Sequence, residues 1–283
     1  MSARAFKQVD VFTSVPLLGN PVAVVLVASG MNDADMQAFA NWTNLSETTF
    51  VLPPTQDGAD YAVRIFTPRN ELVFAGHPTL GTAHAVIEAG IAAPKDGKII
   101  QQCKLGLIEV SVGDTGLSLK MPPNKVTPAP DPAVLAVALK VANFGKGAPQ
   151  VVDVGPHWVI AELDTVEAVE TLTPDLPALA AYDRAHHTTG ITLFAVVSDS
   201  EIIVRTFAPL DGIAEDPVCG SGNGALAAYR LHSDAIKAGD RYLASQGRQV
   251  GRNGKVHIRV DGADIHVGGD CVTVLEGMFR QEK

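Results

Sequence analysis

The sequence predicts a mixed α+β protein with two pseudo-symmetric domains, in each of which a curved, mostly antiparallel sheet surrounds a central helix. Three features predict this class: a long internal repeat, two glycine turns that each lead into a small, apolar helical run, and a proline-rich connector between the two copies of the repeat. A chain of 283 residues is long enough to form two cores of ordinary size.

The repeat is clearest in two stretches, YAVRIFTPRNELVFAGHPTLGTAHAV (61–86) and IIVRTFAPLDGIAEDPVCGSGNGALAAY (202–229). Each contains Val-Arg-x-Phe-x-Pro, then a loop with an x-Pro pair, then a Gly-Thr or Gly-Ser step into a run of small residues. This alignment places His77 opposite Asp216, and Leu80 opposite Cys219. The glycine turns predict helices over about 78–90 and 220–235, and their small apolar residues suit burial inside a curved sheet.

The correspondence continues upstream in the same order. Segments 31–42 and 171–182 both resemble helices that begin at polar capping residues. Segments 47–53 and 191–198 both predict short strands, and 19–27 and 155–163 both predict a buried strand after a glycine. Several matches in one order indicate two equivalent halves rather than a chance similarity.

The domain boundaries follow from composition. The segment MPPNKVTPAPDP (121–132) is rich in proline and forms a stiff connector. We therefore expect a first domain over residues 1–122 and a second over 130–271, with residues from about 272–283 packing back onto the first. Residues 249–279 alternate apolar segments with glycine turns, a pattern typical of antiparallel hairpins.

Composition and charge exclude several function classes. The net charge of −9 comes without a basic cluster, which argues against nucleic-acid binding. No run reaches the roughly 18 apolar residues of a membrane span, and the N-terminal segment lacks an apolar signal core, so we expect a cytoplasmic protein. Cys103, Cys219 and Cys271 are widely spaced and odd in number, which argues against a disulfide framework or a zinc site. The pair His186-His187 has no third ligand at metal-like spacing.

Both repeat loops end where a helix is predicted to begin. Free backbone N–H groups and the helix dipole make such a position favourable for an anion. Glycines such as Gly76 and Gly220 would let the backbone approach a ligand closely, so the two helix starts are candidate carboxylate sites in a cleft between the domains. The competing interpretation is that these glycines only permit tight helix packing. GSGNG (220–224) matches neither the dinucleotide nor the P-loop pattern.

Two kinds of acid–base group accompany these turns. Glu47 begins an apolar strand at a position where the second copy has Ile191. If it is buried, its carboxyl pKa should rise, as a proton shuttle requires. His77 and Asp216 are expected to face one another over the cleft, where they could relay a proton or orient a substrate. The competing interpretations are a surface Glu47 and hydrogen bonds that only stabilise the turns.

Cys219 directly precedes the second predicted helix. A cysteine there is expected to have a lowered pKa and can act as a thiolate base or nucleophile. The alternative is a small buried hydrophobic residue, as most free cysteines are.

Several of these segments together resemble the phenazine-biosynthesis PhzF-like family. The segments are GNPVAVVL (19–26), NLSETTFV (44–51), VRIFTPRNELVFAGHPTLGTA (63–83), EDPVCGSGNGA (215–225) and QGRQVGRNG (246–254). The resemblance is collinear from about residue 5 to 280 and implies the diaminopimelate epimerase-like fold, with cofactor-independent chemistry and a homodimer. It implies that Glu47 is the acid/base, that His77 and Asp216 line the site, and that the backbones of Gly76, Gly220 and Ser221 hold the substrate carboxylate. Cys219 is expected beside them among the substrate-binding residues.

The resemblance implies an isomerase that moves a proton on a small carboxylate-bearing substrate, as trans-2,3-dihydro-3-hydroxyanthranilate isomerase does. Cys219 departs from the isomerase pattern, which has Thr there, and CGSG (219–222) reproduces the turn around one catalytic cysteine of the epimerases. The other epimerase cysteine would fall near Ala75, so a two-thiol racemase is excluded. Two alternatives stay open: an amino-acid or hydroxyacid epimerase that uses Glu47 and Cys219, and a non-catalytic metabolite-binding protein.

Overall fold

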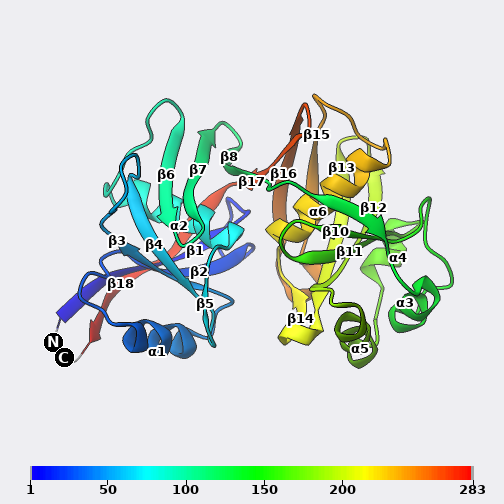
Figure 1. The fold of residues 1–283 in the computed structure, drawn as a ribbon, viewed down its shortest axis with the longest axis horizontal. Helices are drawn as coiled ribbons and strands as arrows, with labels where there is room; N and C mark the ends of the chain where they lie inside the picture. Colours follow the sequence, from blue (N-terminus) through cyan, green and yellow to red (C-terminus); the bar gives the residue numbers. More distant parts are fainter. Residues whose placement is uncertain (1, 282–283) are drawn as a thin grey trace. The chain divides into compact units, whose positions relative to one another are not determined.

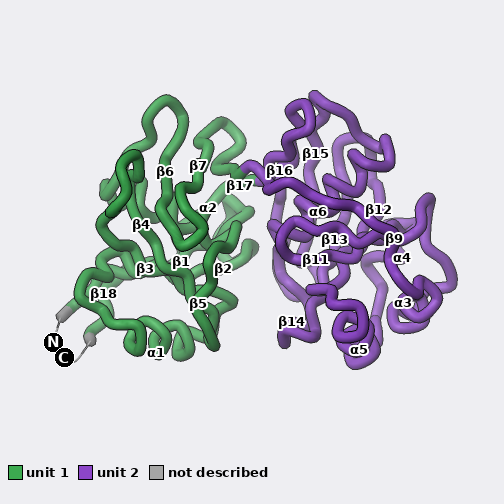
Figure 2. The backbone as a smooth tube through the Cα atoms, viewed as in Figure 1, with its two compact units in different colours: residues 1–119, 268–283 green, residues 120–267 purple. Residues whose placement is uncertain are grey.

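The computed structural model describes residues 2–281 and confirms the predicted mixed α+β class. The chain forms two compact units, one of residues 1–119 with 268–283 and one of residues 120–267 (Figure 2). Within the described residues, no helix combines the length and the apolar composition needed to cross a membrane.

Unit 1 carries the first copy of the repeat. Its strands are β1 (Ser2–Val11), β2 (Asn20–Val25), β3 (Thr48–Leu52), β4 (Tyr61–Phe66), β5 (Glu71–Leu72), β6 (Lys98–Cys103), β7 (Gly106–Gly113), β8 (Gly116–Lys120) and β18 (Cys271–Gln281). Its helices are α1 (Asp33–Thr43) and α2 (Gly76–Glu88). The strand β18 pairs antiparallel with β1, so the C-terminal strand completes the sheet that the N-terminal strand begins (Figure 1).

Unit 2 carries the second copy. Its strands are β9 (Lys125–Pro128), β10 (Gln150–Asp153), β11 (His157–Glu162), β12 (Gly190–Ser198), β13 (Glu201–Ala208), β14 (Ile213–Asp216), β15 (Arg241–Gln246), β16 (Gly254–Asp261) and most of β17 (Asp264–Gly269). Its α-helices are α3 (Pro132–Leu139), α4 (Val166–Glu170), α5 (Leu176–His186) and α6 (Gly220–His232). Two single-turn helices, η1 (Pro209–Asp211) and η2 (Arg248–Val250), lie in its loops.

The strand pairing repeats in the same order in the two units. In unit 1, β2 is parallel to β3, β3 antiparallel to β4, β4 parallel to β6, and β6 antiparallel to β7. In unit 2, β11 is parallel to β12, β12 antiparallel to β13, β13 parallel to β15, and β15 antiparallel to β16. The predicted repeat of architecture is therefore present, with α2 and α6 at equivalent places in the chain.

The residue-level alignment of the repeat is wrong in its loops. Thr48 pairs with Phe66, and Ile191 pairs with the equivalent Phe207, so Glu47 corresponds to Gly190 and not to Ile191. Both helices begin at a glycine, which makes Ala75, and not Leu80, the counterpart of Cys219.

The strand register also shows that His77 and Asp216, which the sequence alignment matched, are not equivalent positions. His77 lies in the first turn of α2, whereas Asp216 ends β14, four positions before α6 begins. The length difference lies earlier, in the hairpins: Glu71 follows its partner Arg64 by 7 positions, whereas Glu215 follows Arg205 by 10. Matching the two x-Pro pairs concealed that difference.

The central helix of each unit is buried because its side chains are small. In α2, the residues from Pro78 to Ala83 are all buried, and α2 contacts strands from both halves of its sheet, including β1, β3, β6 and β18. A Cβ atom added at Gly81 would lie 2.3 Å from a Val22 methyl group, and one added at Gly222 in α6 would lie 2.7 Å from the Thr192 hydroxyl. The sheets can therefore wrap closely around these helices.

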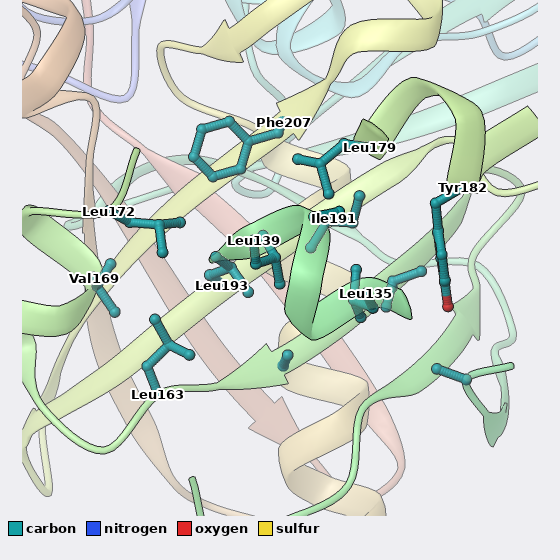
Figure 3. Close-up of a cluster of buried hydrophobic side chains, with 14 of the residues drawn as sticks. Leu135, Leu139, Leu163, Val169, Leu172, Leu179, Tyr182, Ile191, Leu193 and Phe207 are labelled. Carbon is teal, nitrogen blue, oxygen red and sulfur yellow. The ribbon is translucent and has the colours of Figure 1, made fainter. Parts of the chain in front are cut away.

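The opposite face of each sheet is covered by other helices. In unit 1, Met36 and Ala40 of α1 pack against Phe50 of β3 and Phe66 of β4. In unit 2, Figure 3 shows Leu135 and Leu139 beside Ile191 and Leu193. Because successive strand residues point to opposite faces, this arrangement leaves Thr49 and Thr192 directed at the central helices. Each sheet is thus buried on both faces.

An Arg–Glu pair recurs at the same place in both units, partly buried in unit 1 and buried in unit 2. Arg64 of β4 holds Glu71 of β5 through Nε and Nη2 at 2.8 and 2.7 Å. Arg205 of β13 holds Glu215 through the same two nitrogens at 3.0 and 2.7 Å. The Arg205 side chain is 6% exposed and also donates to two backbone carbonyls. These pairs anchor the hairpin strand that precedes each central helix.

We expect Arg205→Met to lower the free energy of unfolding by about 3–5 kcal/mol, because the substitution leaves the buried Glu215 carboxylate without its partner. The double variant Arg205→Met/Glu215→Leu should recover most of this loss, since neither charge then remains buried. Urea unfolding followed by circular dichroism measures both. Arg64→Met is the matched control in unit 1, with a smaller expected loss because the Arg64 side chain is 23% exposed. A double variant as unstable as Arg205→Met alone would contradict the assignment.

Candidate active site

Glu47 and His77 come together in unit 1. Glu47 stands immediately before β3, and His77 is in the first turn of α2. Their Oε2 and Nε2 atoms lie 3.5 Å apart, and the two side chains are only 16% and 10% exposed. The sequence predicted both residues as site residues but did not predict that they would contact each other. Their proximity follows from the burial of α2 against the start of β3.

The His77 imidazole is held in its neutral form. Its ring hydrogen-bonds the backbone of Pro21, and because proline has no N–H, the ring must donate to the carbonyl. Burial lowers the pKa of His77 to about 4, although this hydrogen bond opposes the shift. Within residues 2–281 the Nε2 atom has no hydrogen-bond partner, so Nδ1 is the donor and Nε2 carries a lone pair directed at Glu47. Two proton acceptors therefore face each other with space for one proton.

Asp216 and Cys219 lie in one tight turn in unit 2. The Asp216 Oδ1 atom accepts the Val218 N–H at 3.0 Å, and the Cys219 thiol also hydrogen-bonds this carboxylate. Burial raises the pKa of Asp216 to about 6, and these hydrogen bonds oppose the rise. The carboxyl group is therefore poised to change its charge near neutral pH.

The expectation of a lowered Cys219 pKa is wrong. Burial raises the pKa of the thiol well above its usual value, and the neighbouring Asp216 charge raises it further. The N–H of Gly222 donates to the sulfur at 3.3 Å, so the side chain of Cys219 caps α6. The helix N-terminus does favour a thiolate, but desolvation of a fully buried sulfur outweighs it.

Gln246 holds the turn that carries Asp216 and Cys219. Its Nε2 donates to the Asp216 carbonyl at 2.9 Å, and its Oε1 accepts the N–H of Cys219 at 3.2 Å and the Asn223 amide at 2.8 Å. Gly247 follows with φ of +97°, and a Cβ there would lie 2.2 Å from the Pro217 carbonyl. The resemblance included this Gln-Gly pair without a role for it. Only the fold shows that it clamps the turn.

The first turns of the two central helices differ in how their N–H groups are used. Ala75, the N-cap of α2, provides no side-chain hydrogen bond, and Pro78 has no N–H. Gly76 and His77 therefore present the first N–H groups of α2. In α6 the Cys219 sulfur takes only the Gly222 N–H, and the Ser221 hydroxyl accepts from Trp158 Nε1 at 3.1 Å. The use of these backbone N–H groups for an anion stays a prediction.

The glycines of GSGNG (220–224) have separate roles. Gly220 begins α6, whereas Gly222 and Gly224 permit close packing: a Cβ at Gly224 would lie 2.3 Å from the Met121 methyl group. The packing interpretation is therefore correct for Gly222 and Gly224.

The predicted site residues thus form two groups, one within each unit. Glu47, His77 and Gly76 lie together in unit 1, and Asp216, Cys219, Gly220 and Ser221 lie together in unit 2. The expectation that His77 and Asp216 face each other across a cleft stays a prediction. In the part of the chain that the structure describes, no three His, Cys, Asp or Glu side chains are grouped as metal ligands would be.

We expect His77 to make stability depend on pH with a defined sign. The unfolded histidine takes up a proton near pH 6.5 and the folded one only near pH 4, so acid favours unfolding across this window. Relative to His77→Asn, which retains a donor for the Pro21 carbonyl, the wild-type free energy of unfolding should fall by on the order of 3 kcal/mol from pH 6.5 to 4.

The comparison with a variant is needed because Asp216 acts in the opposite direction. Its raised pKa makes the wild type lose stability as pH rises from 3.8 to about 6, and this contribution cancels between wild type and His77→Asn. Urea unfolding at a series of pH values gives the difference. A difference that stays constant from pH 7 to pH 4 would show that His77 is not held neutral.

The chain matches known proteins over nearly its whole length. The family model described as phenazine biosynthesis-like protein matches residues 9–277. Antisense-enhancing sequence 1 of Schizosaccharomyces pombe is 38% identical over 98% of this chain and 99% of its own. Trans-2,3-dihydro-3-hydroxyanthranilate isomerase of Pseudomonas aeruginosa is 34% identical over 95% of this chain and 96% of its own.

A solved structure shows the same fold. The phenazine biosynthesis protein of the PhzF family from Bacillus anthracis superposes with a TM-score of 0.87 at 22% identity, covering 99% of this chain and 100% of the other. The predicted fold and the predicted isomerase class are thereby confirmed. On the family model and on relatives of more than 30% identity, the chain belongs to the phenazine biosynthesis-like family.

Proposed function

We propose that this protein is an isomerase that moves a proton on a small carboxylate-bearing substrate, with Glu47 as the group that takes and returns the proton. The contact between Glu47 Oε2 and the lone pair of His77 Nε2 carries the proposal. A proton removed from carbon needs a base that is close, partly desolvated and able to return the proton elsewhere. The Glu47–His77 pair has these properties, and its chemistry needs no cofactor.

His77 supports the proton transfer without becoming a permanent cation. Because its pKa is near 4, the imidazole is neutral at physiological pH and accepts a hydrogen bond from protonated Glu47. That hydrogen bond stabilises the protonated carboxyl group during the time between proton abstraction and proton return. A positively charged histidine would instead hold Glu47 ionised and weaken it as a base.

The substrate carboxylate is assigned to the backbone N–H groups at the helix starts. Gly76 and His77 supply them in unit 1, and Gly220 and Ser221 supply them in unit 2. Asp216, with a pKa near 6, is proposed to orient an amino or hydroxyl group of the substrate. The Pseudomonas aeruginosa relative is named for trans-2,3-dihydro-3-hydroxyanthranilate as its substrate.

The epimerase alternative is weakened by the state of Cys219. A two-base epimerase needs a second group that readily accepts a proton, whereas this thiol has a strongly raised pKa and its sulfur caps α6. We therefore assign Cys219 a structural role next to the site.

The cellular setting is also part of the proposal. The family resemblance supports a cytoplasmic homodimer, and light scattering of the purified protein at micromolar concentration measures its oligomeric state.

We expect Glu47→Gln to lower activity by about 10²- to 10⁴-fold, the usual contribution of a general acid–base. The assay incubates the protein with a panel of small amino- and hydroxy-substituted carboxylic acids in deuterium oxide, and mass spectrometry detects the exchanged substrate. Glu109→Gln is the matched control, because Glu109 on β7 forms an exposed ion pair with Lys98 on β6. Full exchange in a folded Glu47→Gln would refute the assignment. If some acids raise the unfolding temperature of the wild type but none of them exchanges deuterium, the metabolite-binding alternative is favoured.

We expect Cys219→Ala to keep most of the activity and to lose about 1 kcal/mol of stability, because it removes the helix cap. Cys219→Ser should restore the stability, since a hydroxyl can accept the Gly222 N–H. Ultraviolet absorbance follows isomerisation, in which a double bond moves, and optical rotation follows epimerisation, in which it does not. The epimerase would be established instead if the wild type changed only the optical rotation of its substrate and a folded Cys219→Ala lost that activity.

A further inference from the structure

A cavity of about 800 Å³ lies within unit 2 at the C-terminal end of α6. Its wall is formed by the last turns of α6, the ends of β11 and β12, the start of β15 and the loop around Gly147. Arg230 follows Ser221 by nine positions in α6, a distance of roughly 14 Å along the helix. The cavity is therefore separate from the turn that carries Asp216 and Cys219. Its volume falls in the range of small-molecule sites.

Arg230 is a buried cation in this wall, and its guanidinium group lies beside the Tyr242 hydroxyl. The residue is 5% exposed, and its Nε and Nη1 atoms make no hydrogen bond within residues 2–281. Its guanidinium carbon lies 4.5 Å from the centre of the Tyr242 ring, which offsets part of the charge. A buried guanidinium normally has carboxylate or carbonyl acceptors, as Arg205 does in the same unit. Arg230 therefore retains donors that a ligand can use.

Other groups in the wall do not neutralise this charge by direct contact. The carboxylates that line the cavity belong to Glu162, Asp199 and Asp240. Burial raises the pKa of Glu162, although Lys146 and Arg230 oppose the rise. The Asp240 carboxylate accepts the backbone N–H of Lys237 at 2.9 Å. Among the described residues, no carboxylate lies within ion-pair distance of Arg230.

The rest of the wall is aromatic and carries hydroxyl groups. The Phe194 and Tyr229 rings lie 6.0 Å apart in an edge-on arrangement. The Tyr242 hydroxyl is buried beside the Arg230 guanidinium, and it has no other hydrogen-bond partner in the described chain. A buried hydroxyl beside a buried guanidinium provides convergent donors for an oxyanion, and the aromatic rings provide an apolar surface for the body of the same molecule.

We propose that this cavity binds a small oxyanion-bearing metabolite, with its oxyanion on Arg230 and Tyr242 and its body against Phe194 and Tyr229. The ligand is defined by its chemistry: a phosphate or carboxylate group on a compact, largely apolar body. The inference does not rest on the proposed isomerase activity, because all its residues belong to one wall of unit 2 at the far end of α6.

Thermal unfolding in inorganic phosphate and, separately, in benzoate tests the proposal at constant ionic strength. The wild-type midpoint should rise by several degrees and saturate with at least one of the two anions. Arg230→Met should abolish the saturable rise while remaining folded, because an apolar side chain replaces a buried, unpaired charge. Arg184→Met, at an exposed position of α5, is the matched control and should respond like the wild type.

Tyr242→Phe keeps the test decisive if Arg230→Met does not fold. It removes only the hydroxyl and should weaken anion binding by about 3- to 10-fold in isothermal titration calorimetry. A response to phosphate alone identifies a phosphorylated ligand, and a response to benzoate alone identifies a carboxylate. An equal rise of the midpoint in the wild type and in Arg230→Met would show general salt stabilisation or binding elsewhere, and it would overturn the proposal. The absence of any rise with either anion would also overturn it.

Discussion

The close fit of each central helix inside its curved sheet is the constraint on which the rest of the structure depends. A helix can be enclosed in this way only if its side chains are small where the strands approach, as at Gly81 against Val22 and at Gly222 against Thr192. Enclosure also fixes where the helix begins. The N-termini of α2 and α6 consequently lie beside strand ends, where Glu47 and Asp216 stand. Packing of the core thus places the groups that are proposed to do the chemistry.

Burial then determines the charge state of those groups. Desolvation lowers the pKa of His77 to about 4 and raises that of Asp216 to about 6, and it raises that of Cys219 well above its usual value. In each case it outweighs the local hydrogen bonds or the helix dipole. A neutral imidazole beside a carboxylate supports proton transfer, and a buried protonated thiol does not. The same effect therefore favours Glu47 and disfavours Cys219 as the working base.

The two units share an architecture, but the side chains at their helix starts differ. The pairs Arg64–Glu71 and Arg205–Glu215 anchor the strand before each helix in the same manner. A glutamine also holds the first turn of each helix, Gln101 through the Thr79 hydroxyl and Gln246 through the Asn223 amide. Among the described residues at the two helix starts, a carboxylate and an imidazole are in contact at the start of α2, whereas the position equivalent to Glu47 is Gly190 in unit 2. The two units therefore share a scaffold and differ in a few side chains near the helix starts.

The sequence by itself determined the fold class, the internal repeat, the strands and helices that carry it, and the identity of the candidate residues, because apolar periodicity and glycine turns are local signals. It could not determine the loop register, which depends on strand pairing, and so it misaligned His77 with Asp216 and Glu47 with Ile191. It also could not determine the Glu47–His77 contact, the clamp made by Gln246 or the sign of the Cys219 pKa shift. Those depend on burial and on partners far apart in the chain, which only the tertiary structure brings together.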